Sequence, residues 1–218
     1  WTRADRSETS PHVIELTELF NRITAWASST IVLQTKTKTR VKILDRIIHI
    51  AIHCKELKNF HALVALVGAL KDPGVTRIRK TWRALPPKLQ NSFEDLVNII
   101  SIQGNWLTYR EQLQVAYKQE VPCVPYIGVF LKDLVFVEDG IPEYIQQKEG
   151  IINFDKHRKV AKVIRQVCEF QQIPYRYIPA APISATLDLT LNVYPLLTEE
   201  ERYNHSLEIE PKKNPKKR

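Results

Sequence analysis

The sequence predicts an all-α fold, and three observations support that prediction. Apolar residues recur at helical spacing along most of the 218-residue chain. One stretch, residues 187–194, is the only modest candidate for a β-strand. No segment repeats at the period of a solenoid. Since 44% of the residues are hydrophobic, we expect a single compact helical domain that packs its core without metals or disulfides.

The first two helices are expected over residues 11–32 and 41–54. Ser10 and Pro11 favour a helix start, because serine caps free amide groups and proline suits the first turn. In the second segment, one helical face carries the apolar residues Ile43, Leu44, Ile47, Ile48 and Ala51. That spacing indicates a face that packs into the core.

The next three helices are expected over residues 60–70, 85–101 and 105–118. The first of these places four apolar residues on one side, Leu63, Val64, Val67 and Leu70. Pro73 and Gly74 follow it and break the helical pattern.

Residues 127–140 predict a helix with two different faces. At about 100° of rotation per residue, one side gathers a core stripe of Ile127, Phe130, Leu131, Leu134 and Val137. A second face, within an arc of about 60°, gathers Gly128, Lys132, Val135 and Asp139. It combines a glycine that permits close approach, a cation, a small apolar residue and a carboxylate. By periodicity alone, this face is a mixed solvent-facing stripe, the commonest kind.

The last expected helix runs from about Phe154 to Gln171. Asp155 lies in its first turn, where a carboxylate suits the helix dipole. One face carries the apolar residues Val160, Val163, Ile164 and Val167.

The net charge of +8 is concentrated at the end of the chain. The segment 211–218, PKKNPKKR, holds five basic residues, and the rest of the chain has 27 basic against 24 acidic residues. We expect this tail to be disordered and solvated. A second cluster, RIRKTWR at 77–83, lacks a nucleic-acid motif, so we expect no nucleic-acid partner.

Residue patterns for covalent chemistry or cofactor binding are missing from the sequence. The six glycines form no phosphate-binding loop, and Cys123 has no base spaced to activate it. His49 and His53 are four residues apart, but no third metal ligand is indicated. We expect no cofactor, no metal and no covalent catalysis.

Three unpaired-looking cysteines and a polar first segment favour a cytoplasmic location, with reduced thiols and no signal peptide. No apolar stretch approaches the roughly 20 residues that a membrane span requires. The chain contains no methionine, even at its first position, which indicates a segment cut from a longer protein.

Several blocks of sequence resemble one known family. They are VPCVPYIGVFLKDL, EDG, IINFDKHRKVAKVI and FQQIPY, with NFHALVALVGAL and VTRIRKTWRALP upstream. In this order they resemble the catalytic domain of guanine-nucleotide exchange factors for Ras-type small GTPases. The ends, WTRADRSETSPH and SLEIEPKKNP, are most similar to the Son of sevenless branch. The resemblance runs from Trp1 to about Pro215.

The resemblance implies an all-α catalytic domain over residues 1–210 with a projecting helical hairpin at about 125–172. The hairpin arms would be about 125–139 and 153–172. In this family the hairpin opens the nucleotide site of the GTPase and accelerates GDP release. By position, Val135 would crowd the Mg²⁺ site, and Asp139 would compete with the α-phosphate for a phosphate-loop serine. Son of sevenless has Leu and Glu at these two positions, and Asp139 is one methylene shorter than Glu.

The same resemblance implies a second contact surface, which grips the second switch of the GTPase. Its residues here would be Val64, Lys71, Thr76, Asn105, Trp106, Tyr126, Gly128 and Lys132. Lys71 and Thr76 stand where Son of sevenless has Asn and Tyr. From the residues alone, Val64 could equally be a core residue and Trp106 a packing anchor.

The expected partner is a Ras-family small GTPase, with Ras first and Rap second. The expected place of action is the inner face of the plasma membrane, with the basic tail contacting anionic lipids. Two alternatives stay open. The first is an exchange-inactive scaffold of the same fold that binds GTPases or adaptors. The second is a nucleic-acid or lipid binder that works through the tail alone.

Overall fold

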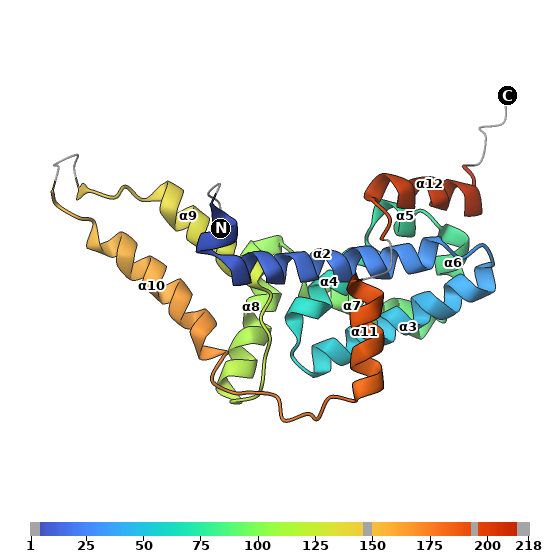
Figure 1. The fold of residues 1–218 in the computed structure, drawn as a ribbon, viewed down its shortest axis with the longest axis horizontal. Coiled ribbons are helices and arrows are strands. Elements are labelled where there is room, and N and C mark those ends of the chain that lie inside the picture. The colour runs from blue at the N-terminus through green and yellow to red at the C-terminus, as the bar shows by residue number, and fades with distance from the viewer. Residues whose placement is uncertain (1–4, 146–149, 193–195, 213–218) are drawn as a thin grey trace. The chain divides into compact units, whose positions relative to one another are not determined.

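The computed structural model describes residues 5–145, 150–192 and 196–212, and these ranges fold into helices (Figure 1). Extended pairing within them is limited to two isolated bridges, Asn59 with Val124 and Tyr144 with Ile152. The all-α prediction is therefore confirmed. Along the chain the helices are α1 (Arg6–Thr9), α2 (Pro11–Val32), α3 (Thr37–Glu56), α4 (Phe60–Leu70), α5 (Pro73–Thr76), α6 (Arg79–Arg83), α7 (Pro87–Ile99), α8 (Gln103–Lys118), α9 (Ile127–Gly140), α10 (Phe154–Glu169), α11 (Ala181–Asn192) and α12 (Glu199–Ile209).

The chain groups into two compact units. The first is drawn from residues 1–55, 62–98 and 177–218, and the second from residues 56–61 and 99–176. The sequence predicted one compact domain, and the packing separates into these two internally connected units. None of the helices that the structure describes is both long and apolar enough to cross a membrane.

Most of the expected helices form at or near the predicted residues. α2, α4 and α9 have the predicted bounds, and the other four differ by a few residues at their ends, where helix boundaries are least defined. The short helices α1, α5 and α6 were not predicted, because four or five residues are too few to show a period.

The strand predicted at residues 187–194 is wrong. Residues 187–192 belong to α11, and residues 193 and 194 lie outside the described ranges. The hydroxyls of Thr186 and Thr190 donate to the carbonyls four residues earlier, at 2.7 and 2.6 Å, as helical threonines do. Leu187 and Leu189 are both about half exposed, so their alternation does not mark a buried sheet face.

The core of the first unit centres on α4. This helix is apolar on nearly every side, and the part of it that belongs to the first unit, residues 62–70, has seven buried residues: Leu63, Val64, Ala65, Leu66, Val67, Ala69 and Leu70. Burial of one valine or leucine side chain contributes about 1.5–3 kcal/mol. α3 adds its predicted stripe, in which Leu44, Ile47, Ile48 and Ala51 are buried and Ile43 is half-buried. The periodic spacing therefore identified the core faces of α3 and α4 correctly.

A buried polar network fastens the end of α12 to the first unit. The Glu210 carboxylate accepts hydrogen bonds from the Lys80 and Thr81 amides at 3.0 and 3.1 Å. Arg40, which is 1% exposed, donates from Nε to the Thr81 hydroxyl at 3.0 Å. The end of α12 is thus held beside α6. Of the predicted tail, only Pro211 and Lys212 fall within the described residues.

The second unit consists mainly of α8, α9 and α10. α9 and α10 pack against each other as the two arms of a hairpin, joined by residues 141–153 (Figure 1). α9 spans Ile127–Gly140 and α10 spans Phe154–Glu169, which agrees with the arms that the family resemblance implied. We call the last turn of α9, residues 141–145 and 150–153, and the first turn of α10 the tip of the hairpin.

Candidate functional site

On the first unit, Lys71 lies two residues before the short helix α5, Thr76 is the last residue of α5, and both are exposed. Between them, the Asp72 carboxylate caps α5 by accepting from the Gly74 amide at 2.8 Å. The same carboxylate accepts a hydrogen bond from Nε of Arg202 at 2.8 Å and forms an ion pair with its Nη2, also at 2.8 Å. Because Asp72 and Arg202 are buried, this ion pair fixes the backbone that displays Lys71 and Thr76.

Val64 lies in the same unit, in the middle of α4, and is 6% exposed. A residue this buried offers little area to a partner. Of the two roles that the sequence left open for Val64, its burial supports packing.

On the second unit, the first turn of α8 has an unusual backbone. Gly104, Asn105 and Trp106 all adopt left-handed conformations, with φ of 58°, 56° and 63°. Outside glycine, this conformation costs roughly 1–2 kcal/mol per residue and persists where the surroundings hold it. Arg110 contributes here, since its Nε donates to the Asn105 carbonyl at 2.9 Å. The turn leaves Asn105 exposed and Trp106 half-buried.

Trp106 belongs to a cluster of aromatic rings that leads to the start of α9. Its ring centroid lies 5.9 Å from that of Tyr109 and 5.6 Å from that of Tyr126. The Tyr126 amide donates to the Tyr109 hydroxyl at 2.8 Å. Burial raises the pKa of both tyrosine hydroxyls, so both stay protonated at neutral pH. Trp106 is therefore a packing anchor, whatever contact its exposed part makes.

Gly128 accommodates the ring of Tyr126. A Cβ atom at position 128 would lie 2.5 Å from both Cζ and Oη of Tyr126, well inside normal contact distance. The sequence suggested that this glycine permits a close approach. The close neighbour is a side chain of the same helix start.

Arg110 also binds one of two consecutive charged residues of α9, Lys132 and Asp133. Its Nη2 donates to both carboxylate oxygens of Asp133, at 2.9 and 2.8 Å. The pair is partly buried, with side-chain exposures of 31% for Arg110 and 24% for Asp133. The neighbouring Lys132 is exposed. Asp133 therefore joins α9 to α8, and Lys132 is left on the surface.

The second face of α9 lies outside the buried core. Lys132 and Asp139 are exposed, and Gly128 and Val135 are half-buried. Phe136 borders this face, about 40° from Lys132 on the helix, and is 77% exposed. The sequence analysis did not single out Phe136, although the same angular count that defined the face places it there.

The predicted core stripe of α9 is only partly correct. Phe130 is buried, while Ile127, Leu131, Leu134 and Val137 are half-buried. Val129, which was not assigned to the stripe, is 1% exposed. A hairpin arm has neighbours on fewer sides than a core helix, so an apolar stripe on it is covered only in part.

At the tip, a lysine bridges the two arms. Lys156 lies in the first turn of α10, and its side chain is 5% exposed. Its Nζ atom is 3.1 Å from Glu138 Oε1 and 3.2 Å from Glu143 Oε2. Glu138 belongs to the last turn of α9, next to Asp139. No pattern in the sequence indicated this bridge.

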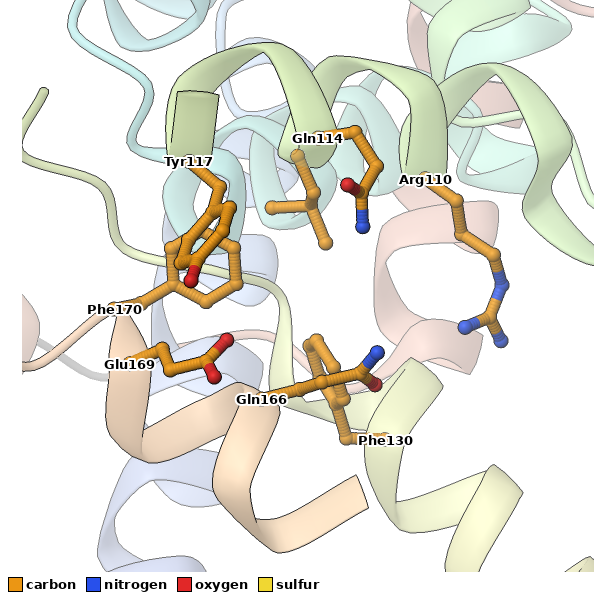
Figure 2. Close-up of a pocket in the computed structure, with 8 residues that line it drawn as sticks. Arg110, Gln114, Tyr117, Phe130, Gln166, Glu169 and Phe170 are labelled. Carbon is orange, nitrogen blue, oxygen red and sulfur yellow. The ribbon is translucent and has the colours of Figure 1, made fainter. Parts of the chain in front are cut away.

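At the base of the hairpin, α8, α9 and α10 line an open pocket of about 180 Å³ (Figure 2). Figure 2 shows the amides of Gln114 and Gln166 directed into it from α8 and α10. The rings of Tyr117 and Phe170 meet edge to face at one side, with centroids 6.4 Å apart. The pocket is lined by Arg110, Leu113, Gln114, Tyr117, Phe130, Gln166, Glu169 and Phe170.

The three thiols are free. Burial raises the pKa of Cys123 to about 12 and that of Cys54 to about 11. Neither is a thiolate at neutral pH, which disfavours both as nucleophiles. Cys168 is exposed.

Comparison with known proteins identifies the family. The RasGEF domain family matches residues 1–158 of this chain. The chain belongs to the RasGEF family. This RasGEF domain is 33% identical, over 99% of its length, to Ras guanine nucleotide exchange factor M of Dictyostelium discoideum. It is 31% identical over 97% of its length to Ras-specific guanine nucleotide-releasing factor 1 of Rattus norvegicus. It is 32% identical over 93% of its length to Cell division control protein 25 of Saccharomyces cerevisiae.

The RasGEF domain spans less than a quarter of each of these relatives, namely 23%, 16% and 12% of their lengths. The family that the sequence blocks indicated is confirmed. The finer similarity to the Son of sevenless branch stays a prediction.

Proposed function

We propose that this RasGEF domain accelerates GDP release from a Ras-family small GTPase by inserting the tip of its hairpin into the nucleotide site. The observation that carries the proposal is the second face of α9, where Val135 and Asp139 lie one turn apart outside the buried core. Val135 would crowd the Mg²⁺ position, and Asp139 would compete with the α-phosphate for a serine hydroxyl of the phosphate loop. A carboxylate in that position excludes the nucleotide by like charge.

This mechanism needs no covalent step and no cofactor from the RasGEF domain. A ten-thousandfold acceleration of release requires a barrier lower by about 5.5 kcal/mol. Interactions made only when the nucleotide site is open can supply that difference. By linkage, the domain and the nucleotide weaken each other's binding to the GTPase by the same factor.

Further contacts with the GTPase are proposed on each unit separately. On the first unit, they are the exposed residues Lys71 and Thr76 beside the capped helix α5, with Val64 beneath the surface. On the second unit, they are Asn105, Trp106, Tyr126, Gly128 and Lys132. The rigid settings described for Asp72 and Arg110 support these choices, since a pre-organised surface loses less entropy on binding.

We propose Ras as the first partner to test and Rap as the second. The names of the relatives from Dictyostelium and rat support Ras, since they refer to Ras factors. Lys71 and Thr76 are the positions at which a preference for Rap would enter, because they differ in size and charge from the residues of Son of sevenless.

We also propose that the domain works in the cytoplasm at the inner face of the plasma membrane, with the basic tail on anionic lipids. Arg77 and Lys212 support this, because both lie over the ring of Tyr203, at 5.7 and 5.8 Å from its centroid. The internal basic run and the start of the tail therefore adjoin. Each basic residue near an anionic surface contributes about 1 kcal/mol. Truncation after Glu210 should weaken sedimentation with phosphatidylserine vesicles and leave GDP release in solution unchanged.

The test of the central proposal is stopped-flow release of a fluorescent GDP from Ras and from Rap. Acceleration that saturates with the RasGEF domain supports exchange. Gel filtration with nucleotide-free GTPase then separates exchange from scaffolding. An exchange factor forms a complex that excess GDP and Mg²⁺ dissociate, whereas a complex that survives excess nucleotide contradicts the proposal, because equal affinity for both states shifts nothing.

A further inference from the structure

We propose that Lys156 is the positioning residue of the hairpin. Its ammonium group, held between Glu138 and Glu143, ties the start of α10 to the last turn of α9 and so sets where the Asp139 carboxylate stands. The inference rests on the proposed exchange function and adds to it a residue that acts through α9, without touching the nucleotide site itself.

The burial of Lys156 is the first step. Its side chain is 5% exposed, whereas the side chains of Glu138 and Glu143 are 65% and 44% exposed. A lysine is rarely buried unless its charge is paired, because an ammonium without partners loses its hydration. Here it is paired on two sides, by one carboxylate from α9 and one from the connection. Both partners therefore need to stay in place for the lysine to stay buried.

The charge state agrees with this geometry. Burial alone would lower the pKa of Lys156, but its hydrogen bonds to Glu138 and Glu143 outweigh that effect and raise the pKa. The hydrogen bond from Lys156 is also the main reason that the pKa of Glu143 is lowered. Lys156 and Glu143 are therefore both charged at neutral pH, and their contact is an ion pair under the conditions of exchange.

Hydrogen bonds also hold Pro142 and Glu143 beside the start of α10. The Asn153 amide donates to the Glu143 carbonyl at 2.7 Å, and the Asn153 side-chain amide donates to the Pro142 carbonyl at 3.0 Å. His157 Nε2 lies 2.9 Å from Glu143 Oε1. Glu143 is thus fixed to the start of α10 by main chain and side chain. Lys156 then adds an ion pair from the start of α10 to Glu138 in the last turn of α9.

That link matters because Glu138 and Asp139 are consecutive. Successive helical residues point about 100° apart, so holding the Glu138 carboxylate on the α10 side turns Asp139 away from α10 and toward the open face. Without the link, the last turn of α9 is free to fray, as helix ends do. The Asp139 carboxylate would then sample many positions, and one methylene less than Glu leaves it little excess reach. A fixed last turn restores part of that precision.

The first experiment measures release kinetics for Lys156→Met, which keeps the length of the side chain and removes its charge. We expect the maximal GDP-release rate to fall about tenfold, equivalent to about 1.4 kcal/mol, and the half-saturating concentration to change less than threefold. Lys156→Arg should restore part of the rate. Lys162→Met is the matched control, since Lys162 is an exposed lysine of the same helix. It should behave as the parent domain does.

A double-mutant cycle distinguishes positioning from direct contact with the GTPase. If Lys156 acts through α9, Glu138→Gln should slow release as well, and the double variant should be no slower than Lys156→Met alone. Additive losses would mean that Lys156 acts independently of Glu138 and would overturn the proposal. Should Lys156→Met lose helical circular dichroism, Glu138→Gln alone carries the test, because its side chain is 65% exposed.

Amide hydrogen exchange of the RasGEF domain without any GTPase supplies a readout that does not depend on exchange activity. Lys156→Met should increase exchange of the amides at 137–141 and leave those of α8 unchanged. Unchanged protection at 137–141 would overturn the proposal even if release slowed. If the parent domain released GDP from no Ras-family GTPase, the proposed function would fail, and protection at 137–141 would still decide whether the bridge holds α9.

Discussion

Substitution of Gly128 by Ala tests the packing at the start of α9. The added methyl group would lie 2.5 Å from Cζ and Oη of Tyr126 and 2.9 Å from Cε1. Ordinary contacts between such atoms are about 3.5–4.0 Å, so the ring must move by about 1 Å. It cannot move freely, because its centroid is 5.6 Å from Trp106 and 6.0 Å from His61. The clash is therefore paid in lost ring contacts.

The magnitude follows from two effects. Overpacking by one methyl group costs about 1–3 kcal/mol, and an aromatic pair contributes about 0.5–1.5 kcal/mol beyond the area that it buries. We expect Gly128→Ala to lower the free energy of unfolding by about 2 kcal/mol, with up to about 1 kcal/mol returned by the better helix propensity of alanine. The net loss should be about 1–2 kcal/mol.

The assay is equilibrium urea denaturation, followed by circular dichroism and by tryptophan fluorescence, for four proteins. These are the parent, Gly128→Ala, Tyr126→Ala and the double variant. Removal of the ring makes room for the methyl group, so Gly128→Ala should cost nothing, or even stabilise, in the Tyr126→Ala background. The coupling should be about 1–3 kcal/mol. Equal effects of Gly128→Ala in both backgrounds would refute the role assigned to this glycine.

Three other perturbations have definite expected results. Val135→Glu combined with Asp139→Ala should slow GDP release at least about tenfold, or 1.4 kcal/mol, with unchanged helical circular dichroism, because neither side chain is buried; full activity would contradict the hairpin assignment. Arg202→Met should cost about 3–5 kcal/mol in urea denaturation, because it leaves the buried Asp72 carboxylate without its cation, and a loss under 1 kcal/mol would count against that account. Hydrogen bonds from the cap of α12 lower the pKa of Glu201, so this group stabilises the fold above its unfolded pKa near 4.5 and the contribution disappears as the pH falls through the lowered value. Glu201→Gln should flatten the dependence of the urea midpoint on pH over that acid range.

What the sequence predicted well is what depends on neighbours along the chain. The spacing of Leu63, Val64, Val67 and Leu70 identified a buried helix face because the partners of a core stripe need only be apolar. The second face of α9 came from the same angular count along the helix, and it lies outside the buried core. The strand predicted at 187–194 failed because leucines that alternate with polar residues fit a short helix as well as a strand, and only burial decides between them.

What could not be predicted depends on pairs that are far apart in sequence. Lys156 is recognisable as a bridge only when α10 is seen to return along α9, since its partners lie 18 and 13 positions earlier. The left-handed backbone of Asn105 and Trp106 has no local signal in the sequence beyond Gly104. It is stabilised by the hydrogen bond from Arg110 to the Asn105 carbonyl. Gly128 was expected to permit a close approach, and the ring of Tyr126 that lies against it became evident only from the structure.

The pocket at the base of the hairpin indicates where the angle of the two arms can change. At the tip, Lys156 joins the two arms by ion pairs, so we expect α9 and α10 to move together. At the base, the two arms line an open pocket of about 180 Å³, with the rings of Tyr117 and Phe170 at one side. A packed core resists displacement because it has no room to yield, and here there is room. We therefore expect a change in hairpin angle to alter the volume of this pocket and to leave the ion pair at the tip intact. The hairpin should bend at its base.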